Sequence, residues 1–199
     1  FDLSGVGIPD TVNDALPDNT LHYVPFTYAG TVDAYKLTSE MATTEEYAEQ
    51  KKYPHSLFVA DYAVAYAASW DHLNAIDMIF GKDYAAGGVD YTLRAPSEGS
   101  DYTGSGDSER GTPQSNEWDR LLDKDDGYIK NWSGICSWGQ DSCMIVDRAV
   151  RGYYSGHFWT YYEATYPYPI SGFRPVLEAL NPDTLGSDGL KTVALDLNG

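Results

Sequence analysis

The stretch from Arg148 to Leu177 constrains the fold of this chain more than any other part of the sequence. Glycine and proline interrupt it too often for a sustained helical period, and strand-like residues border it at Met144 to Val150 and Gly172 to Leu177. The stretch also holds six tyrosines: Tyr153, Tyr154, Tyr161, Tyr162, Tyr166 and Tyr168. The sequence therefore predicts a loop-rich aromatic surface that is held by a β-sheet.

The size and charge of the chain limit its possible partners. Its 199 residues are 42% hydrophobic and 14% aromatic, so they can bury a core, and a single domain over residues 1–199 is the simplest organisation. Thirty acidic and thirteen basic residues give a net charge of −17, which repels phosphate backbones and argues against nucleic acid as a partner. The longest apolar stretches, such as Phe58 to Ser69, are too short to cross a bilayer, so we expect no membrane insertion.

Two segments show the signals of helices. In the first, Ser69 to Gly81, Ser69 is the expected N-cap, apolar residues recur at three- and four-residue spacing, and Gly81 ends the pattern. The second segment, Pro113 to Leu122, has Ser115 or Asn116 as its cap. The predicted core consists of Trp70, Leu73, Ile76, Phe80, Trp118, Leu121, Trp159, Phe173 and Val176.

Strand-like composition marks three further segments. β-Branched and aromatic residues occur in Leu21 to Leu37, where Ala29-Gly30 is expected to separate two strands. The same composition returns in Ser56 to Tyr66 and in Leu190 to Leu197. These segments, with the two borders of the tyrosine-rich stretch, predict several short strands.

The other segments favour loops and one surface helix. Lys82 to Thr112 is rich in Gly, Ser and Asp, and is predicted to be a long loop with at most one short strand, Tyr91 to Leu93. Ser39 to Lys52 is a charged, helix-compatible stretch of the kind found on a surface. Helices followed by short strands and long loops indicate an α+β domain.

The residues offer no strong signal for catalysis or for a metal site. Asp123 to Gly127 is similar to a calcium loop, but Gly127 and Gly134 stand where oxygen ligands are needed, so a solvated turn is expected. No nucleophile motif of the Gly-x-Ser-x-Gly type occurs near a histidine. The histidines never fall at metal-ligand spacing: His22, His55, His72 and His157. We therefore expect no enzyme activity, no metal and no cofactor.

The chain has two cysteines, Cys136 and Cys143, separated by six residues. This spacing permits a local disulfide, and it permits two free thiols equally well. It lacks the further ligands of a zinc site. A bridge would indicate an oxidising compartment.

The tyrosine-rich stretch has two interpretations. Tyrosine is common in strands and half-buried cores, and Phe158 and Trp159 are expected to be core residues. Loops that mix Tyr, Ser, Gly and His also have the composition of protein-binding surfaces, because Tyr offers a large contact area at low entropic cost. Six tyrosines within sixteen residues exceed the need of one core, so we favour binding over packing.

Three segments, in order, resemble a known fold. Ser69-Trp70-Asp71 and Pro113 to Asp119, with its Glu117-Trp118 pair, are similar to the starts of two helices in that fold. Arg151-Gly152 and Gly172-Phe173-Arg174 are similar to its late signals. The resemblance is to the C-type-lectin-like fold of formylglycine-generating enzymes and of the variable proteins of diversity-generating retroelements. It spans about residues 69–177 and implies an α+β domain with two helices, short antiparallel strands and long loops.

Departures from the motifs separate the branches of this superfamily. The enzymes carry a copper-binding cysteine pair between the late tryptophan and the Gly-Phe-Arg signal, whereas Trp159 to Ser171 contains no cysteine. The Glu-Pro-Asn and Trp-Asn-Asp motifs of sugar-binding C-type lectins are also missing. The chain resembles the variable proteins in ending the tyrosine-rich stretch with Ser-Gly-Phe-Arg-Pro-Val-Leu, residues 171–177.

This resemblance implies a mechanism of diversification over about residues 132–175. The retroelement copies a template with errors at adenines, and errors in the first two bases of an Asn codon reach Tyr, Ser, His, Asp, Thr and Ala, but not Trp, Glu, Gln, Lys or Met. The implied variable ligand contacts are Tyr153, Tyr154, Ser155, His157, Tyr161, Tyr162, Tyr166 and Tyr168. The implied constant positions are Trp138, Gln140, Trp159 and Glu163.

The expected function is therefore ligand binding of the receptor or adhesin type, with a protein or cell-surface ligand. The resemblance implies an extracellular location, on a cell surface or on a virion of a phage or virus. Two alternatives are a relative of the formylglycine-generating oxidases and a structural surface domain without a specific ligand.

Overall fold

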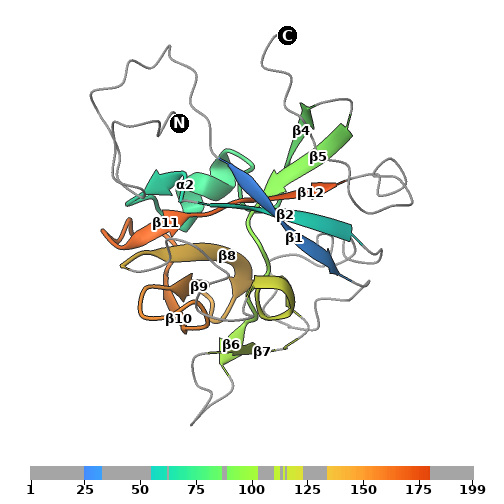
Figure 1. The fold of residues 1–199 in the computed structure, drawn as a ribbon. Coiled ribbons are helices and arrows are strands. Elements are labelled where there is room, and N and C mark those ends of the chain that lie inside the picture. Colours follow the sequence, from blue (N-terminus) through green and yellow to red (C-terminus); the bar gives the residue numbers. More distant parts are fainter. Residues whose placement is uncertain are drawn as a thin grey trace.

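A computed structural model describes residues 25–32, 55–61, 63–86, 89–102, 110–112, 114, 116–122 and 134–179 (Figure 1). Over these residues the fold is mostly β-sheet, with two five-stranded sheets, a small two-stranded sheet and two short helical segments. It is a mixed arrangement of α and β elements in which strands predominate. No helix in this part of the chain has the length and apolar character needed to span a membrane.

The first five-stranded sheet is antiparallel throughout. Its order is β1-β2-β12-β5-β4. The strands are β1 (Phe26–Val32), β2 (His55–Ala60), β12 (Val176–Ala179), β5 (Val89–Arg94) and β4 (Lys82–Ala86). β12 lies at the centre, so the end of the tyrosine-rich stretch is anchored on both sides.

The second five-stranded sheet has the order β10-β9-β8-β11-β3 and contains one parallel pair, β8 with β11. Its strands are β10 (Trp159–Glu163), β9 (Asp147–Gly152), β8 (Cys136–Ser142), β11 (Ser171–Phe173) and β3 (Ala65–Tyr66). β6 (Asp101–Tyr102) and β7 (Gly111–Thr112) form the small sheet. Most of the predicted contact residues lie on β10 or in the loops next to it.

The two large sheets are joined by the short segment between β11 and β12. Arg174 in this segment is buried, and its Nη1 donates to the carbonyl oxygens of Ala60 at 3.4 Å and Asp61 at 3.2 Å. Gly172 permits the close approach of neighbouring strands, because a Cβ there would lie 2.9 Å from both Ala65 O and Ile135 Cγ2. The Gly-Phe-Arg signal therefore lies where the chain passes from β11 of one sheet to β12 of the other.

The first predicted helix is present but short. α2 (Trp70–Ala75) begins where expected, since Ser69 Oγ accepts the backbone hydrogen bond of His72 at 3.2 Å. It ends before Gly81 because Asp77 adopts a left-handed backbone with φ of 64°. The prediction of Ile76 as a core residue is wrong, since its side chain is 43% exposed, and Ile79 is buried in its place.

The second predicted helix is a single turn of π-helix, η2 (Trp118–Leu122). Asn116 is the cap, because its Oδ1 accepts the hydrogen bond of Asp119 N at 2.8 Å. Trp118 is 1% exposed, which confirms its place in the core. The side chains of Leu121 and Leu122 lie outside the described residues.

Several predictions for strands need correction. Residues 82–112 are not one long loop, because β4, β5, β6 and β7 all lie there; pairing of β5 with β12 supplies hydrogen bonds that composition does not reveal. The predicted strand Tyr91 to Leu93 is confirmed within β5. The prediction of two strands divided at Ala29-Gly30 is wrong: β1 is one strand, and its pairing with β2 shifts in register between Tyr28 and Gly30. The predictions for residues 39–52, 123–127 and 190–197 lie outside the described residues.

Aromatic side chains dominate the core. The main cluster consists of Trp70, Leu73, Ile79, Phe80, Ala95, Cys136, Trp138, Val150, Ala164 and Phe173. All four tryptophans in the described ranges also donate an indole hydrogen bond to a distant carbonyl oxygen: Trp70 to Gly139 (2.9 Å), Trp118 to Gly156 (2.7 Å), Trp138 to Ala68 (2.8 Å) and Trp159 to Gly99 (3.0 Å). Each tryptophan therefore both fills the core and holds a backbone segment against it.

Candidate ligand-binding surface

The loop between β9 and β10 carries four of the predicted contact residues: Tyr153, Tyr154, Ser155 and His157. Its backbone closes on itself, because Gly152 N donates to Phe158 O at 3.0 Å and Phe158 N donates to Ser155 O at 3.2 Å. Tyr154 is 69% exposed, and the other three side chains are half-buried. The loop thus exposes the large side chain of Tyr154 to solvent and exposes the other three side chains only in part.

The backbone at the start of this loop is strained. Gly152 has φ of 103° and Tyr153 has φ of 78°, a region that residues with a Cβ seldom adopt. Two backbone hydrogen bonds hold Tyr153 there, from its N to Ile135 O and from Gly134 N to its O, both at 3.0 Å. A strained non-glycine residue that its surroundings hold in place is typical of functional sites.

Buried side chains fasten the same loop through its carbonyl oxygens. Trp118 Nε1 donates to Gly156 O at 2.7 Å, and Arg151 Nη2 donates to His157 O at 3.1 Å. Arg151 is itself held by Asp119 Oδ1 at 2.7 Å and lies over the Trp118 ring, 5.4 Å from its centroid. Because these bonds end on backbone atoms of the loop, they do not depend on which side chains the loop carries.

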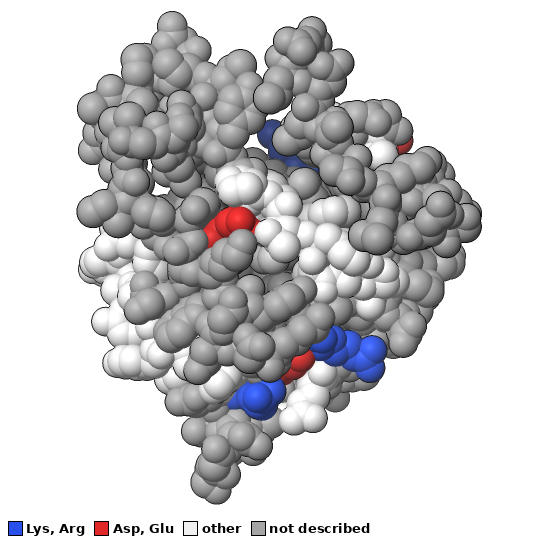
Figure 2. Space-filling model, in the orientation of Figure 1, with Lys and Arg blue, Asp and Glu red and all other residues white. Residues whose placement is uncertain are grey.

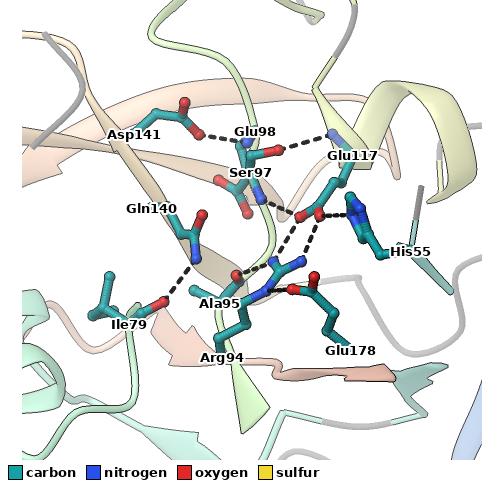
Figure 3. A network of polar contacts seen from close by, with 10 residues as sticks. All are labelled: His55, Ile79, Arg94, Ala95, Ser97, Glu98, Glu117, Gln140, Asp141 and Glu178. Carbon is teal, nitrogen blue, oxygen red and sulfur yellow. Dashed lines mark hydrogen bonds and ion pairs between the residues drawn. The ribbon is translucent and has the colours of Figure 1, made fainter. Parts of the chain in front are cut away.

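A buried polar network holds Glu117, the residue that directly precedes Trp118 and Asp119 (Figure 3). Its centre is Glu117, which is fully buried and accepts hydrogen bonds from both terminal nitrogens of Arg94, at 2.8 and 2.5 Å. His55 Nε2 lies 2.7 Å from Glu117 Oε1, and Ser97 N donates to Glu117 Oε2 at 2.9 Å. Arg94 also pairs with Glu178 of β12 at 2.6 Å. The network therefore ties the start of η2 to three strands of the first sheet.

An extended buried segment, residues 95–99, follows β5 of the first sheet and contacts β8 of the second. Gln140 N donates to Pro96 O at 3.1 Å, and the Asp141 carboxylate accepts from the backbone of Glu98 at 2.5 Å and Gly99 at 3.2 Å. Trp159 Nε1 donates to Gly99 O at 3.0 Å. Residues 95–99 thus connect β8 to the start of β10, which explains why this irregular backbone can be buried.

Glu98 is the most unusual residue beside the loop. Its side chain is fully buried, and neither carboxyl oxygen has a hydrogen-bond partner among the described residues. Burial raises its pKa well above 4.5, with further raising by Asp141 and Asp119, while Arg151 opposes the shift. This position favours a neutral carboxyl group, since a buried carboxylate without hydrogen bonds is costly.

Tyrosine side chains form two contacting groups near this loop. Tyr154 lies edge-on to Tyr153, with ring centroids 4.6 Å apart, and to Phe158 at 4.9 Å. Tyr168 contacts Tyr162 at 4.4 Å and Tyr166 at 4.6 Å. Tyr166 is 53% exposed and Tyr168 is half-buried.

Tyr162 joins these groups to the core. Its ring lies 6.4 Å from that of Trp138, and its hydroxyl is hydrogen-bonded to the thiol of Cys136. Burial raises the pKa of Tyr162 to about 12, and Cys136, Tyr154 and Tyr168 add to the rise. Tyr162 is therefore partly a packing residue, and the hydroxyls of Tyr154 and Tyr168 lie near it.

Tyr161 departs from the expectation that the six tyrosines lie on one side. Successive residues of a strand face opposite ways, so Tyr161 lies on the face of β10 opposite to Tyr162. It is 37% exposed and contacts Trp159, whose ring centroid is 6.0 Å away. Trp159 is buried as predicted, whereas Phe158 is only half-buried. The candidate surface therefore consists of Tyr153, Tyr154, Tyr162, Tyr166 and Tyr168, with Ser155 and His157 in the same loop.

The proposed bridge between Cys136 and Cys143 is not formed. Both cysteines are free, because Cys136 starts β8 and Cys143 follows its end. A strand advances about 3.3 Å per residue, which separates them far beyond the roughly 7 Å that a disulfide allows. Burial raises the pKa of each thiol to about 12.

Three residues position the loop: Trp118, Asp119 and Arg151. Trp118 was predicted as a core residue, and the other two were recognised only as parts of the fold motifs. Asp119 belongs to the Glu117-Trp118-Asp119 motif and Arg151 to the Arg151-Gly152 motif. These two residues are 32 positions apart in the sequence, yet their side chains form an ion pair. Glu98 was not singled out by any sequence signal. Acidic residues are so common in this chain that one buried carboxyl group cannot be recognised from composition.

On the face drawn in Figure 2, the described basic and acidic side chains occupy small areas among uncharged residues, and one acidic area lies between two basic ones. Within the described ranges, no group of three or more His, Cys, Asp or Glu side chains is arranged to hold a metal ion. Comparisons with protein-family models, with curated proteins and with solved structures found no match.

Proposed function

We propose that this chain is a ligand-binding protein of the receptor or adhesin type, which recognises a protein or cell-surface ligand through its tyrosine surface. The observation that carries the proposal is the way the loop at residues 152–158 is held. Trp118 and Arg151 bind its carbonyl oxygens, while Tyr154 is 69% exposed. A backbone fixed from beneath and side chains turned outward are what a recognition loop requires.

The aromatic contacts support binding in a second way. Tyr154 and Tyr166 are the most exposed tyrosines of the surface, and each contacts a further tyrosine at 4.6 Å. Such contacts restrict the rings before a ligand arrives, so less side-chain entropy is lost on binding. Large, restrained aromatic side chains are also frequent hot spots of protein interfaces.

We further propose that the surface is diversified by a retroelement, as the resemblance implies. Five described positions in residues 132–175 cannot be reached from an Asn codon, and three of them are buried: Trp138, Gln140 and Trp159. Met144 is 47% exposed, and Glu163 is exposed and accepts a hydrogen bond from Thr165 at 2.6 Å. Positions that can vary include the exposed Tyr154 and Tyr166. This division fits diversification that spares the core.

The C-type-lectin-like fold is part of the same proposal. It is supported by the roles of the motif residues: Ser69 caps α2, Glu117-Trp118 begins η2, and Gly172 to Arg174 joins the sheets. An extracellular location on a cell or virion surface is part of the same proposal, because it is implied by the resemblance to the variable proteins.

The oxidase alternative receives less support. Such an enzyme needs two reactive cysteines close together, whereas Cys136 is fully buried and its thiol pKa is raised to about 12. An oxidase assay on a cysteine-containing peptide, with and without copper, tests this alternative directly. Peptide oxidation that depends on Cys136 would favour it over binding.

A display library tests the proposed function. Codons for Tyr154, Ser155, His157, Tyr166 and Tyr168 are randomised together, and protease resistance reports the folded fraction. We expect most members to stay folded and some to bind a chosen target protein after selection. A matched library at Trp118, Trp138, Val150, Trp159 and Phe173 should mostly lose protease resistance. Equal loss of folding in both libraries would contradict the proposal and favour a structural domain.

Sequencing of the DNA beside the coding region tests the diversification separately. A near-copy of the codons for about residues 132–175, next to a reverse transcriptase gene, is the expected result. Without such a copy, the retroelement part of the proposal is wrong, while the binding part stands on the library.

A further inference from the structure

The hairpin tip between β8 and β9 exposes three consecutive apolar side chains. Met144 is 47% exposed, Ile145 is 93% exposed and Val146 is 56% exposed. Single exposed apolar residues are ordinary on protein surfaces, but adjacent large ones at a projecting turn mark an interaction site. We call Met144, Ile145 and Val146 the apolar tip.

The backbone holds the apolar tip without help from its side chains. Ala164 N donates to Val146 O at 2.8 Å, and Cys143 N donates to Asp147 O at 3.3 Å. Arg148 Nη1 donates to Ile145 O at 3.4 Å, and its guanidinium lies over the Trp70 ring, 4.5 Å from the centroid. The backbone of the tip is therefore held in place while its side chains are exposed. The hydrogen bond from Ala164 places the tip beside the loop that carries Tyr166.

Three acidic residues of the described part of the chain lie near the apolar tip. Asp147 follows it directly and pairs in register with the exposed Glu163 of β10. Asp71 is also exposed. Burial lowers the pKa of Arg148, and Asp71 lies close enough to Arg148 to oppose this shift. Arg148 is the neighbouring cation, and it is half-buried against Trp70. The rim of the tip is thus negative, in a chain of net charge −17.

We propose that the apolar tip is a second contact surface, which inserts into an apolar patch flanked by Lys or Arg on a partner protein. Apolar burial supplies affinity, and the acidic rim pairs with the basic flanks and steers the approach. A second copy of this chain fits poorly, since two acidic rims would repel each other. A lipid surface fits poorly as well, because it offers the acidic rim no cationic side chains. The proposal does not depend on diversification of the tyrosines.

A defined probe tests this proposal: a synthetic helical peptide with leucine along one face and lysine along the others. Its binding to the full chain is followed by fluorescence anisotropy. We expect binding that weakens at high salt, and that weakens at least about tenfold in the double variant Met144→Ser, Ile145→Ser. The matched control is Tyr84→Ser on β4 of the other sheet, where Tyr84 is 49% exposed. It should bind like the parent.

Further variants separate this inference from the proposed function. Tyr154→Ser should leave peptide binding unchanged, because Tyr154 follows the end of β9 that lies away from the apolar tip. Thermal melts should show all variants folded, since the altered side chains are exposed.

Four results would overturn the proposal. They are equal binding to parent and tip variant, no binding at peptide concentrations up to about 1 mM, tip-dependent binding to phosphatidylcholine vesicles, and tip-dependent self-association in sedimentation.

Discussion

Trp118 donates its indole hydrogen bond to the carbonyl oxygen of Gly156, 38 residues further along the chain, at 2.7 Å. This one contact couples the second helical segment to the loop that carries Tyr154. Since the donor is buried and the acceptor is a backbone atom, the loop conformation is set by the core.

The first prediction concerns Trp118 itself. Trp118→Ala should lower the free energy of unfolding by about 3 to 5 kcal/mol, because it leaves a large cavity and removes the hydrogen bond to Gly156. Trp118→Phe should cost less, since it keeps most of the apolar volume. Urea denaturation followed by circular dichroism measures both. An unchanged free energy of unfolding for Trp118→Ala would show that η2 is not part of the core.

The second prediction compares tyrosines of different burial. Tyr154→Ser should change the free energy of unfolding by no more than about 0.5 kcal/mol, because its side chain is largely exposed. Tyr162→Ser should cost about 2 kcal/mol or more, since it removes packing against Trp138 and the contact with Cys136. Chemical denaturation of each variant gives the comparison. Loss of the folded structure in the double variant Tyr154→Ser, Tyr166→Ser would refute the surface assignment.

The third prediction concerns the connection between the sheets. Gly172→Ala should destabilise by about 1 to 3 kcal/mol, because its Cβ would lie 2.9 Å from Ala65 O and Ile135 Cγ2. Gly134→Ala is the matched control: no atom lies within 4 Å of its Cβ, so only its left-handed backbone, with φ of 80°, opposes the change. Thermal melts that rank Gly134→Ala as the worse variant would contradict the observed packing of β3 against β11.

The fourth prediction concerns pH. Burial raises the pKa of Glu98 above 4.5, so the stability that its neutral form contributes is fully present below about that pH and is lost as pH rises through the folded-state pKa. Glu98→Gln removes this titration. The variant should therefore gain stability relative to the parent as the pH rises from about 4 to 8.

Denaturation midpoints across that pH range measure the Glu98 effect. Glu163→Gln, a change at an exposed carboxyl group, is the control and should follow the parent. A difference between Glu98→Gln and the parent that does not vary with pH would show that Glu98 does not titrate differently in the folded state.

Local signals in the sequence predicted several elements well. Ser69 caps α2 because a serine hydroxyl before an apolar period satisfies a free backbone N–H, and this depends on neighbouring residues alone. The burial of Trp118, Trp159 and Phe173 likewise followed from their hydrophobicity and their place in the motifs. The absence of a helix from the tyrosine-rich stretch was also predicted, because glycine and proline interrupt it, but the strand β10 within it was not.

Other features depended on partners distant in the chain. β4 lies in a segment that looked like loop, and only Tyr91 to Leu93 of β5 was predicted, since the hydrogen bonds of these strands come from each other and from β12. The exposure of Ile76 and the burial of Ile79 follow from the left-handed turn at Asp77, which periodicity does not foresee. The separation of the cysteines by an extended strand could not be read from a spacing of six residues.

The sequence by itself determined which side chains are available for recognition: a run of tyrosines with Ser, Gly and His between two strand-like borders. Tertiary structure alone decided how they are divided, with Tyr154 and Tyr166 exposed, Tyr162 packed on the core and Tyr161 on the opposite face of β10. The physical reason is that amino-acid type sets what a residue can contact, whereas burial and facing are set by strand register and by long-range bonds such as that from Trp118 to Gly156.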